Sequence, residues 1–428
     1  MDNLTPYLEA MAAQPGDTVG WLAEQRHAAL NRFKVQGWPS KKLEAWRYAD
    51  LRPLARTSFV GRDDHVDEQY AHDLVAGLPA QRGDRLVFVA GQLMPALSSL
   101  GGTAVRALSS ALADNPDRLK DRLVTGPSAP SSIADLNAAL MREGVVIDVA
   151  PTDSPEPIEI VHIAVPGVAP SGAHIRHLFR LAPDTTATIR ERFLGEGDHW
   201  LNLVMQCELG KSSTLDLVSE TRREGGIQTW EGEVTLGADA RFNHFVLHAG
   251  GASLRTALTV NVEGEGAHAE LAGVQLGRGT DVHDIRTQLN HKVLGATSNQ
   301  SFKAVVDDRA ASSFQGKVVV ARDAQKTDAQ QSSRNLLLKR TAEANTKPEL
   351  EIYADDVQCA HGATVGELDK DALFYLMSRG LTPTAARSLL IEAFVADVID
   401  EITDEHVRAQ ITDVAANWMH AALEGGER

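Results

Sequence analysis

A recurring turn divides the middle of the chain into segments of similar length. The turns are Leu181-Ala-Pro-Asp, Leu209-Gly-Lys-Ser, Leu236-Gly-Ala-Asp, Val262-Glu-Gly-Glu and Leu294-Gly-Ala-Thr, and their spacing stays in the twenties until the last interval, which is slightly longer. Between them lie short runs of alternating polar and apolar residues, with almost no helical period. A strand repeat in the twenties predicts coils stacked into a parallel β-helix. An antiparallel sandwich is the alternative, but its strands would usually recur at shorter intervals, about every ten positions.

Helical patterns precede this repeat. Apolar residues recur at three-to-four spacing near the N-terminus, at Trp21, Leu22, Ala29, Leu30 and Phe33. A strand-like run, Arg85 to Gly91, interrupts the helical pattern, and the proline-rich stretch Pro151 to Pro157 is typical of a linker. We therefore expect a mainly helical N-terminal domain at 1–145, a linker at 146–157 and the β-helix core at 158–366.

The helical period returns after Gly366 and predicts a C-terminal helical domain at 367–428. Asp369 is a candidate cap for a short helix that ends near Gly380, and Thr382 with Pro383 begins the next helix. A broad apolar stripe follows, formed by Leu390, Ile391, Phe394, Val395, Val398, Ile399 and Ile402. Such a stripe is most often plain core, but in so short a domain it is also a candidate docking face for a partner.

Charge and cysteine content exclude several classes of protein. With 42 basic and 58 acidic residues, the formal charge is -16, whereas a surface for nucleic acid or anionic lipid needs clustered Lys and Arg. Met1 to Gln14 has no apolar signal region, and the chain has no apolar run of about 18 residues. We therefore expect a soluble, cytoplasmic protein. Cys207 and Cys359 are too few for a disulfide framework or an all-cysteine metal site.

Two segments are similar to phosphate loops, but both are incomplete. Gly210-Lys211-Ser212 is similar to the end of a phosphate loop, but Met205 stands where the first glycine is required. Gly316-Lys317 fails in the same way, with Ala311 upstream. If the protein's work uses ATP, we expect another subunit to hydrolyse it. A β-helix enzyme acting on polysaccharide would need a carboxylate cluster on one β-face, and no strong spacing supports one.

Cys359 and His361 are the best chemical clue in the chain. If the run from Leu350 to Cys359 is extended, residues i and i+2 share a face, and the two side chains point the same way, roughly 6 to 7 Å apart at Cα. One soft metal ion could contact both. The alternative is that Cys359 is a small buried hydrophobe and that His361 is a turn residue at a strand end, where Gly362 follows.

Two other polar groups have a structural interpretation. Asp281, His283 and His291 form a looser cluster, which we interpret as polar groups at the edge of a coil, with a metal site as the alternative. The polar run from Lys326 to Asn335 leads into an apolar one and is interpreted as a solvated turn before a strand. Cys207 lies in no motif and is expected to be a buried hydrophobe.

Several separated segments carry a family resemblance, and they occur in the family's order. They are Gly37-Trp-Pro-Ser-Lys-Lys-Leu-Glu-Ala-Trp-Arg47, Lys326-Thr-Asp-Ala-Gln330, Arg334-Asn-Leu-Leu-Leu338, Lys347-Pro-Glu-Leu-Glu-Ile-Tyr-Ala-Asp-Asp-Val357, Cys359-Ala-His-Gly-Ala-Thr-Val-Gly366 and Phe374-Tyr-Leu-Met-Ser-Arg-Gly380. Together they resemble the SufB/SufD family of the SUF machinery, which assembles iron–sulfur clusters. With only two cysteines and no N-terminal cysteine cluster, the chain is similar to the SufD branch rather than to SufB.

The resemblance implies a right-handed parallel β-helix core between two helical domains. It also implies a non-catalytic scaffold subunit that pairs with SufB and binds the ABC-type ATPase SufC, which would supply the ATP hydrolysis. A homodimer of the isolated chain is an alternative assembly. A rival to the metal-binding scaffold is a purely structural partner that stabilises SufB and recruits SufC without binding metal.

The resemblance also assigns roles to residues. His361 would help to form the site of a nascent, transient iron–sulfur cluster shared with SufB, with Cys359 as a second candidate ligand; imidazole suits iron, and a thiolate from SufB would be the softer ligand. SufC docks on the C-terminal helices in the family. The expected partner interface comprises Phe374, Tyr375, Arg379, Leu390 and Phe394.

Overall fold

The computed structural model describes residues 19–49, 52–57, 59, 67–80, 82–102, 104–125, 131–153, 156–166 and 171–424. The N-terminal segment Met1 to Gln14, which was considered above for a signal region, lies outside these ranges. Within them, no helix combines the length and the apolar character needed to cross a membrane.

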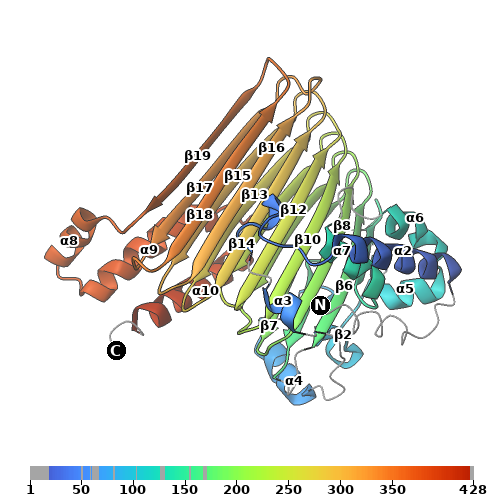
Figure 1. The fold of residues 1–428 in the computed structure, drawn as a ribbon, viewed down its shortest axis with the longest axis horizontal. Coiled ribbons are helices and arrows are strands. Elements are labelled where there is room, and N and C mark those ends of the chain that lie inside the picture. Colours follow the sequence, from blue (N-terminus) through green and yellow to red (C-terminus); the bar gives the residue numbers. More distant parts are fainter. Residues whose placement is uncertain are drawn as a thin grey trace.

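Two long sheets of mainly parallel strands form the body of the molecule (Figure 1). The 10-stranded sheet, here sheet A, has the order β19-β17-β15-β13-β11-β9-β7-β5-β1-β2, and the 9-stranded sheet, sheet B, has the order β18-β16-β14-β12-β10-β8-β6-β4-β3. From β4 onward, successive strands of the chain therefore alternate between the sheets, and each strand pairs with the strand two further on. This topology confirms the parallel β-helix and rules out the antiparallel sandwich.

The strands have nearly uniform lengths. Those of the coils are β4 (Val145–Val149), β5 (Ile158–Ala164), β6 (Gly172–Leu181), β7 (Thr186–Gly195), β8 (Trp200–Leu209), β9 (Thr214–Thr221), β10 (Ile227–Leu236), β11 (Arg241–His248), β12 (Ser253–Val262), β13 (His268–Gly277), β14 (Val282–His291), β15 (Thr297–Val306), β16 (Ala311–Val320), β17 (Asp328–Leu337), β18 (Glu343–Ile352) and β19 (Gln358–Gly366). Ile227 pairs with Ser253 one coil further on, and Ala311 pairs in the same way with Glu343. The sequence offsets between these register partners match the spacing of the turns.

The repeated turns hold one residue each in the left-handed conformation. The residues with positive φ are Asp184, Ser212, Asp239, Gly266, Gly295 and Lys326, at equivalent places in successive coils. The amide of Asp184 donates to the carbonyl of Lys211 at 2.8 Å, and the amide of Ser212 donates to that of Ala238 at 2.8 Å. The turns are therefore bonded to one another along the stack, in addition to the ladders of the sheets. Gly210-Lys211-Ser212 is one of these strand-to-strand turns.

The N-terminal end of the β-helix is closed by short strands and helices. The elements are α2 (Gly20–Gln36), η1 (Glu44–Trp46), α3 (Arg52–Arg56), α4 (Glu68–Ala76), β1 (Arg85–Val89), β2 (Gln92–Leu93), η2 (Pro95–Leu97), β3 (Val105–Ala107), α5 (Leu108–Asp114), α6 (Asp117–Thr125) and α7 (Ser132–Leu140). Helix α7 docks on sheet B, where the Asn137 amide donates to the carbonyls of Ile175 at 2.8 Å and Asn202 at 2.9 Å.

The expected linker at 146–157 is wrong at its start. Residues 146–149 belong to β4, which pairs with β6 and extends sheet B. The reason is local, because Val145 to Val149 is a short apolar run that becomes buried once it joins a sheet. Likewise β1 pairs in parallel with β5, so the segment before residue 146 adds strands to both sheets. The division of the chain into separate domains stays a prediction.

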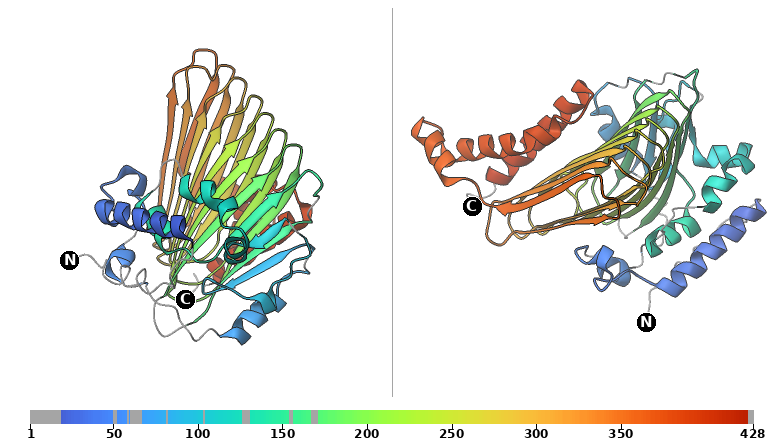
Figure 2. Two further views of the ribbon diagram at one scale, coloured as in Figure 1. Left: turned by 90° about the vertical axis from the view of Figure 1, so that its right-hand side faces the viewer. Right: turned by 90° about the horizontal axis from the view of Figure 1, so that it is seen from above.

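The C-terminal helices are α8 (Lys370–Ser378), α9 (Pro383–Ile399) and α10 (Glu405–Glu424). Helices α9 and α10 cover sheet A, whereas the N-terminal helices α2 and α7 lie on the opposite side (Figure 2). Asp369 and Thr382 cap α8 and α9 as expected, because each side chain accepts a backbone N–H of the first turn. The apolar stripe of α9 packs with α10 and with outward residues of sheet A such as Val274 and Val305.

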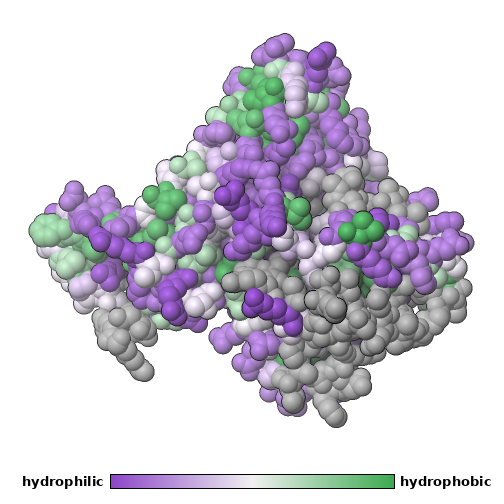
Figure 3. Space-filling model, viewed as in Figure 1, coloured by the Kyte–Doolittle hydropathy of each residue, from purple (hydrophilic) through white to green (hydrophobic). Residues whose placement is uncertain are grey.

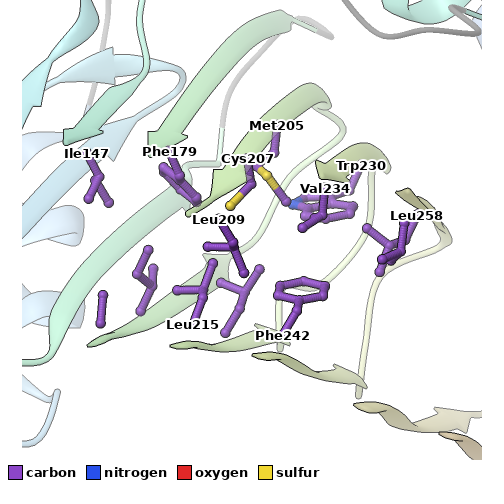
Figure 4. Close-up of a cluster of buried hydrophobic side chains, with 14 of the residues drawn as sticks. Ile147, Phe179, Met205, Cys207, Leu209, Leu215, Trp230, Val234, Phe242 and Leu258 are labelled. Carbon is purple, nitrogen blue, oxygen red and sulfur yellow. The ribbon is translucent and has the colours of Figure 1, made fainter. Parts of the chain in front are cut away.

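Apolar side chains fill the interior between the two sheets. Figure 4 shows Cys207 among Met205, Leu209 and Val234, and Cys207 is 2% exposed. Burial raises the pKa of the Cys207 thiol far above its ordinary value. Cys207 is therefore a buried hydrophobe, as the sequence predicted, and the larger apolar side chains around it each contribute roughly 1.5–3 kcal/mol to folding.

Candidate metal-binding site at the open end of the β-helix

Cys359 and His361 lie on β19, the last strand of sheet A. The expected single extended run is wrong, because β18 ends at Ile352 and a turn intervenes before β19 begins at Gln358. That turn is the next repeat of the coil, in which the amide of Lys326 donates to the carbonyl of Asp356 at 2.6 Å. The strand also continues past Gly362. His361 is therefore a strand residue, and the two side chains share a face because they lie two positions apart.

The shared face points into the β-helix. Cys359 is half-buried and packs with Ala329, Val318 and Val320, all of which are interior residues of the preceding coils. Burial raises the pKa of the Cys359 thiol, a hydrogen bond with the backbone of Ala329 opposes this effect, and the nearby Asp328 carboxylate adds to it. Cys359 is thus mainly a neutral thiol near neutral pH. His361 is exposed, because within the described chain no further coil covers it.

The end of the β-helix that carries His361 has two unpaired edges. Within the described residues, β19 pairs only with β17, and β18 pairs only with β16. Both strands lie at the outer end of the coils in Figure 1. Their ladder N–H and C=O groups on the outer side are therefore available to another chain.

Helix α8 presents the other residues that were expected at an interface. Phe374 is 74% exposed and Tyr375 is 56% exposed, and Arg379 is exposed over the Tyr375 ring. Figure 1 places α8 beyond the last coil, and Figure 3 shows hydrophobic surface in the same region. These three residues thus lie on α8 and at its C-terminal cap.

The other two expected interface residues lie on α9 and are half-buried. Leu390 is next to the buried stripe. Phe394 packs against sheet A, where the ammonium of the buried Lys303 lies 4.8 Å from its ring centroid and donates to its carbonyl oxygen. Phe394 therefore holds α9 on the β-helix within this chain.

A second cluster of ligand-type residues lies inside the first coils. Single ligand atoms of His162, His177 and Glu191 lie within 4.8 Å of one another, and all three residues are buried. Glu191 Oε1 is 3.2 Å from His177 Nε2 and 3.6 Å from His162 Nε2, while Glu191 Oε2 accepts from Trp230 Nε1 at 2.9 Å. By residue type this triad could hold a metal ion.

Hydrogen bonding argues for a different role. The backbone N–H of Val145 donates to Nδ1 of His177 at 3.1 Å, so a neutral His177 carries its proton on Nε2. That nitrogen can donate to Glu191 but cannot bind a metal, and a metal-bound imidazole normally donates with its other nitrogen instead. Burial raises the Glu191 pKa, but the attraction of the nearby His162 and His177 side chains to the carboxylate outweighs burial and lowers the pKa to about 2. The triad is best described as a buried carboxylate held by its neighbours.

The cluster of Asp281, His283 and His291 does not come together as one site. His283 and His291 are buried inside the β-helix, each 1% exposed, so the expectation that they lie at a coil edge is wrong. His291 Nε2 lies 2.9 Å from Ser298 Oγ, across the interior. Asp281 instead accepts from the backbone N–H of Arg278 at 3.1 Å in a turn. Both histidines occupy inward positions of β14, and their even spacing in the strand fits that placement.

Sequence reasoning missed the triad of His162, His177 and Glu191. The three residues come from β5, β6 and β7, and their separations along the chain match no metal-binding motif. The available signal was a polar residue at an inward position of each strand, which becomes readable only once the coil register is known. Gln331, which neighbours His361 in the register, was also missed for this reason.

Fold and site together define a parallel β-helix protein whose open end presents a histidine and a cysteine beside unpaired strand edges. Residues 164–394 match the family described as SUF system FeS cluster assembly, SufBD core domain. The chain belongs to this family, which confirms the resemblance.

The chain is also similar along most of its length to two curated relatives. It is 32% identical to the iron–sulfur cluster assembly protein SufD of Escherichia coli (strain K12), over 90% of each chain. It is 30% identical to an iron–sulfur cluster assembly SufBD family protein of Synechocystis, over 92% of this chain and 90% of the relative. The SufD of Bacillus subtilis is 27% identical over 65% of each chain.

Proposed function

We propose that this chain is a cytoplasmic, non-catalytic scaffold subunit of the SUF iron–sulfur cluster assembly complex. In this role it pairs with SufB and binds the ATPase SufC, and His361 is a ligand of a nascent cluster at the SufB interface. The observation that carries the proposal is the position of His361, exposed on the last strand, at the mouth of the β-helix and beside an unpaired edge.

The edges of β18 and β19 support the pairing with SufB. A partner strand that continues either sheet would satisfy the outer N–H and C=O groups. It would also bring its own side chains over the mouth of the β-helix, because residues of adjacent strands in register stand side by side on one face. A thiolate of SufB placed there would complete a mixed site with the His361 imidazole.

Cys359 supports the site as a second, conditional ligand. Its sulfur shares the inward face with His361, but burial raises its thiol pKa. A metal ion must displace that proton, and it favours the thiolate strongly enough to do so when other ligands hold it nearby. We therefore assign the primary role to His361 and a supporting role to Cys359.

The C-terminal helices support the contact with SufC. Phe374 and Tyr375 expose large apolar surfaces on α8, a helix with no buried residue of its own. Aromatic side chains and Arg are the residue types that most often dominate binding energy. Leu390 and Phe394 on α9 would hold this helix pair in place. In this chain Gly210-Lys211-Ser212 is a turn between strands and does not lead into a helix as a phosphate loop does. We therefore assign ATP hydrolysis to SufC.

The raised pKa of Cys359 also favours the rival role, in which the chain stabilises SufB and recruits SufC without binding metal. Anaerobic reconstitution separates the two. We expect the complex with SufB to take up iron and sulfide, and His361→Ala to lower the cluster content by more than about half, with both subunits still bound. A His361→Ala complex with normal cluster content would contradict the proposal and leave the structural role.

His72→Ala is the matched control, because His72 is a surface histidine on α4 with a side chain 64% exposed. It should leave the cluster content unchanged. Cys359→Ser in the same assay tests the role of the thiol. If Cys359 is a ligand, this variant should lower the cluster content, and if Cys359 only packs in the interior, the cluster content should not change.

A further inference from the structure

Gln331 lies directly behind His361 in the β-helix. The two residues are register partners on the neighbouring strands β17 and β19, so their side chains stand next to each other on the inward face. Gln331 is only 4% exposed. Neither its Nε2 nor its Oε1 has a hydrogen-bond partner among the described residues, although buried amides are almost always paired.

The Gln331 side chain crosses the interior and ends against a glycine. A Cβ placed on Gly316, in β16 of the opposite sheet, would collide with Nε2 of Gln331 and would lie 2.7 Å from Cζ of Phe314. The amide therefore rests on the bare Cα of Gly316, between the two sheets. Gly316 leaves room for the Gln331 amide between the sheets but does not offer it a hydrogen-bond partner.

The inward row that contains His361 and Gln331 continues through sheet A into the coils. Successive inward register partners of His361, followed into the coils, are Gln331, Gln300, Leu271, His244 and Leu217. Gln300 differs from Gln331 in its oxygen only, because its Oε1 accepts from Thr287 Oγ1 at 2.6 Å while its Nε2 also has no partner among the described residues. Thr346 Oγ1, on the other terminal strand, has no partner among the described residues either. The Gln331 amide oxygen, next to His361 in the register, is thus unpaired, whereas the Gln300 oxygen one coil deeper is paired.

We propose that Gln331 is a positioning residue for His361, in that its amide oxygen accepts the ring N–H of His361 when the other ring nitrogen binds a transition-metal ion. Metal-binding histidines nearly always donate their second N–H to an oxygen acceptor such as a carboxylate, a carbonyl or a water, which fixes the tautomer and the ring orientation. The unpaired amide oxygen of Gln331, on the strand next to His361, is a carbonyl-type acceptor. This inference rests on the proposed function, because it requires His361 to bind metal.

The test titrates the complex of the full chain with SufB with Co²⁺ under anaerobic conditions and follows the visible absorption of the bound ion. Gln331→Met keeps the length of the side chain and removes the acceptor, and it should weaken Co²⁺ binding about tenfold. Gln331→Glu restores an acceptor and should bind Co²⁺ within about threefold of the unmodified chain. Gln300→Met, one coil deeper, is the matched control and should leave Co²⁺ affinity unchanged.

The metal-free chain supplies a second readout. If Gln331 serves the site rather than the fold, Gln331→Met should unfold at the same denaturant concentration as the unmodified chain or at a higher one, because it removes two unpaired buried groups. Gln300→Met should unfold earlier, since it breaks the bond with Thr287. A Gln331→Met chain that binds Co²⁺ normally, or that is destabilised without rescue of binding by Gln331→Glu, overturns the inference.

His361→Ala distinguishes the two proposals. If it abolishes Co²⁺ binding while Gln331→Met leaves binding unchanged, the inference about Gln331 fails and the proposed function stands. If His361→Ala binds Co²⁺ like the unmodified chain, the proposed function fails, and the inference fails with it.

Discussion

Three histidines inside the β-helix predict that acid destabilises this chain steeply. His244, His283 and His291 are each 1–3% exposed, and their rings lie between the two sheets. Burial disfavours the charged imidazolium and lowers the pKa of each to about 4. In the unfolded chain the same side chains have their ordinary pKa of about 6.5.

The direction of the pH effect follows from the two protonation states. Between about pH 6.5 and pH 4 the unfolded chain holds protons on these histidines and the folded chain does not. The free energy of unfolding is therefore highest above the unfolded pKa and decreases as the pH is lowered. Near about pH 5.5 each histidine takes up about 0.9 proton on unfolding, or about 2.7 protons for the three. These three histidines should then lower the free energy of unfolding by about 3.7 kcal/mol per pH unit.

Denaturant unfolding followed by tryptophan fluorescence at about pH 7, 6, 5.5 and 5 measures this slope. His291→Gln can keep a hydrogen bond to Ser298 but cannot titrate, so it should reduce the slope by about 1.2 kcal/mol per pH unit. The reasoning is refuted if the free energy of unfolding changes by less than about 1 kcal/mol between about pH 6 and pH 5, or if His291→Gln leaves the slope unchanged.

Three further predictions concern particular side chains. Trp230→Phe removes the 2.9 Å hydrogen bond to the buried Glu191 carboxylate and should lower the free energy of unfolding by about 2 kcal/mol; an unchanged denaturation midpoint would show that Glu191 does not need it. Iodoacetamide at neutral pH should modify Cys359 more slowly than a free thiol, because its pKa is raised, and mass spectrometry finding the rate of a free peptide thiol would contradict this. Replacing both Phe374 and Tyr375 with Ser should weaken SufC binding at least about tenfold in calorimetry with little change in stability, whereas Val35→Ser, at an 88% exposed residue on α2, should not; equal effects would argue against docking on α8.

The architecture was predictable because its signal is repeated. Each coil needs a turn at the same place, and the residues with positive φ at Asp184, Ser212 and Asp239 recur with the spacing of the turns. The caps of α8 and α9 were predictable for a local reason, since Asp369 and Thr382 precede apolar helical patterns. The start of the linker was wrong because the apolar run from Val145 to Val149 gains its stability from pairing with β6, which lies far along the chain.

The candidate site was predictable only in part. The spacing of Cys359 and His361 indicated a shared face, but the turn before β19 depends on contacts with the preceding coil, such as that of Lys326 with Asp356. The triad of His162, His177 and Glu191, and the neighbour relation of Gln331 and His361, depend on register between strands. Register is set by the lengths of the intervening turns, and these vary from coil to coil.

The most direct test of the central claim is to detect the nitrogen of His361 on the cluster. This chain, labelled with ¹⁵N only in histidine, is assembled with unlabelled SufB and SufC, loaded with iron and sulfide, reduced, and studied by pulsed electron paramagnetic resonance. We predict a ¹⁵N hyperfine coupling typical of an iron-bound imidazole, and its loss in His361→Ala but not in His72→Ala. A cluster signal without that coupling, or with a coupling that survives His361→Ala, would contradict the claim that His361 is a cluster ligand.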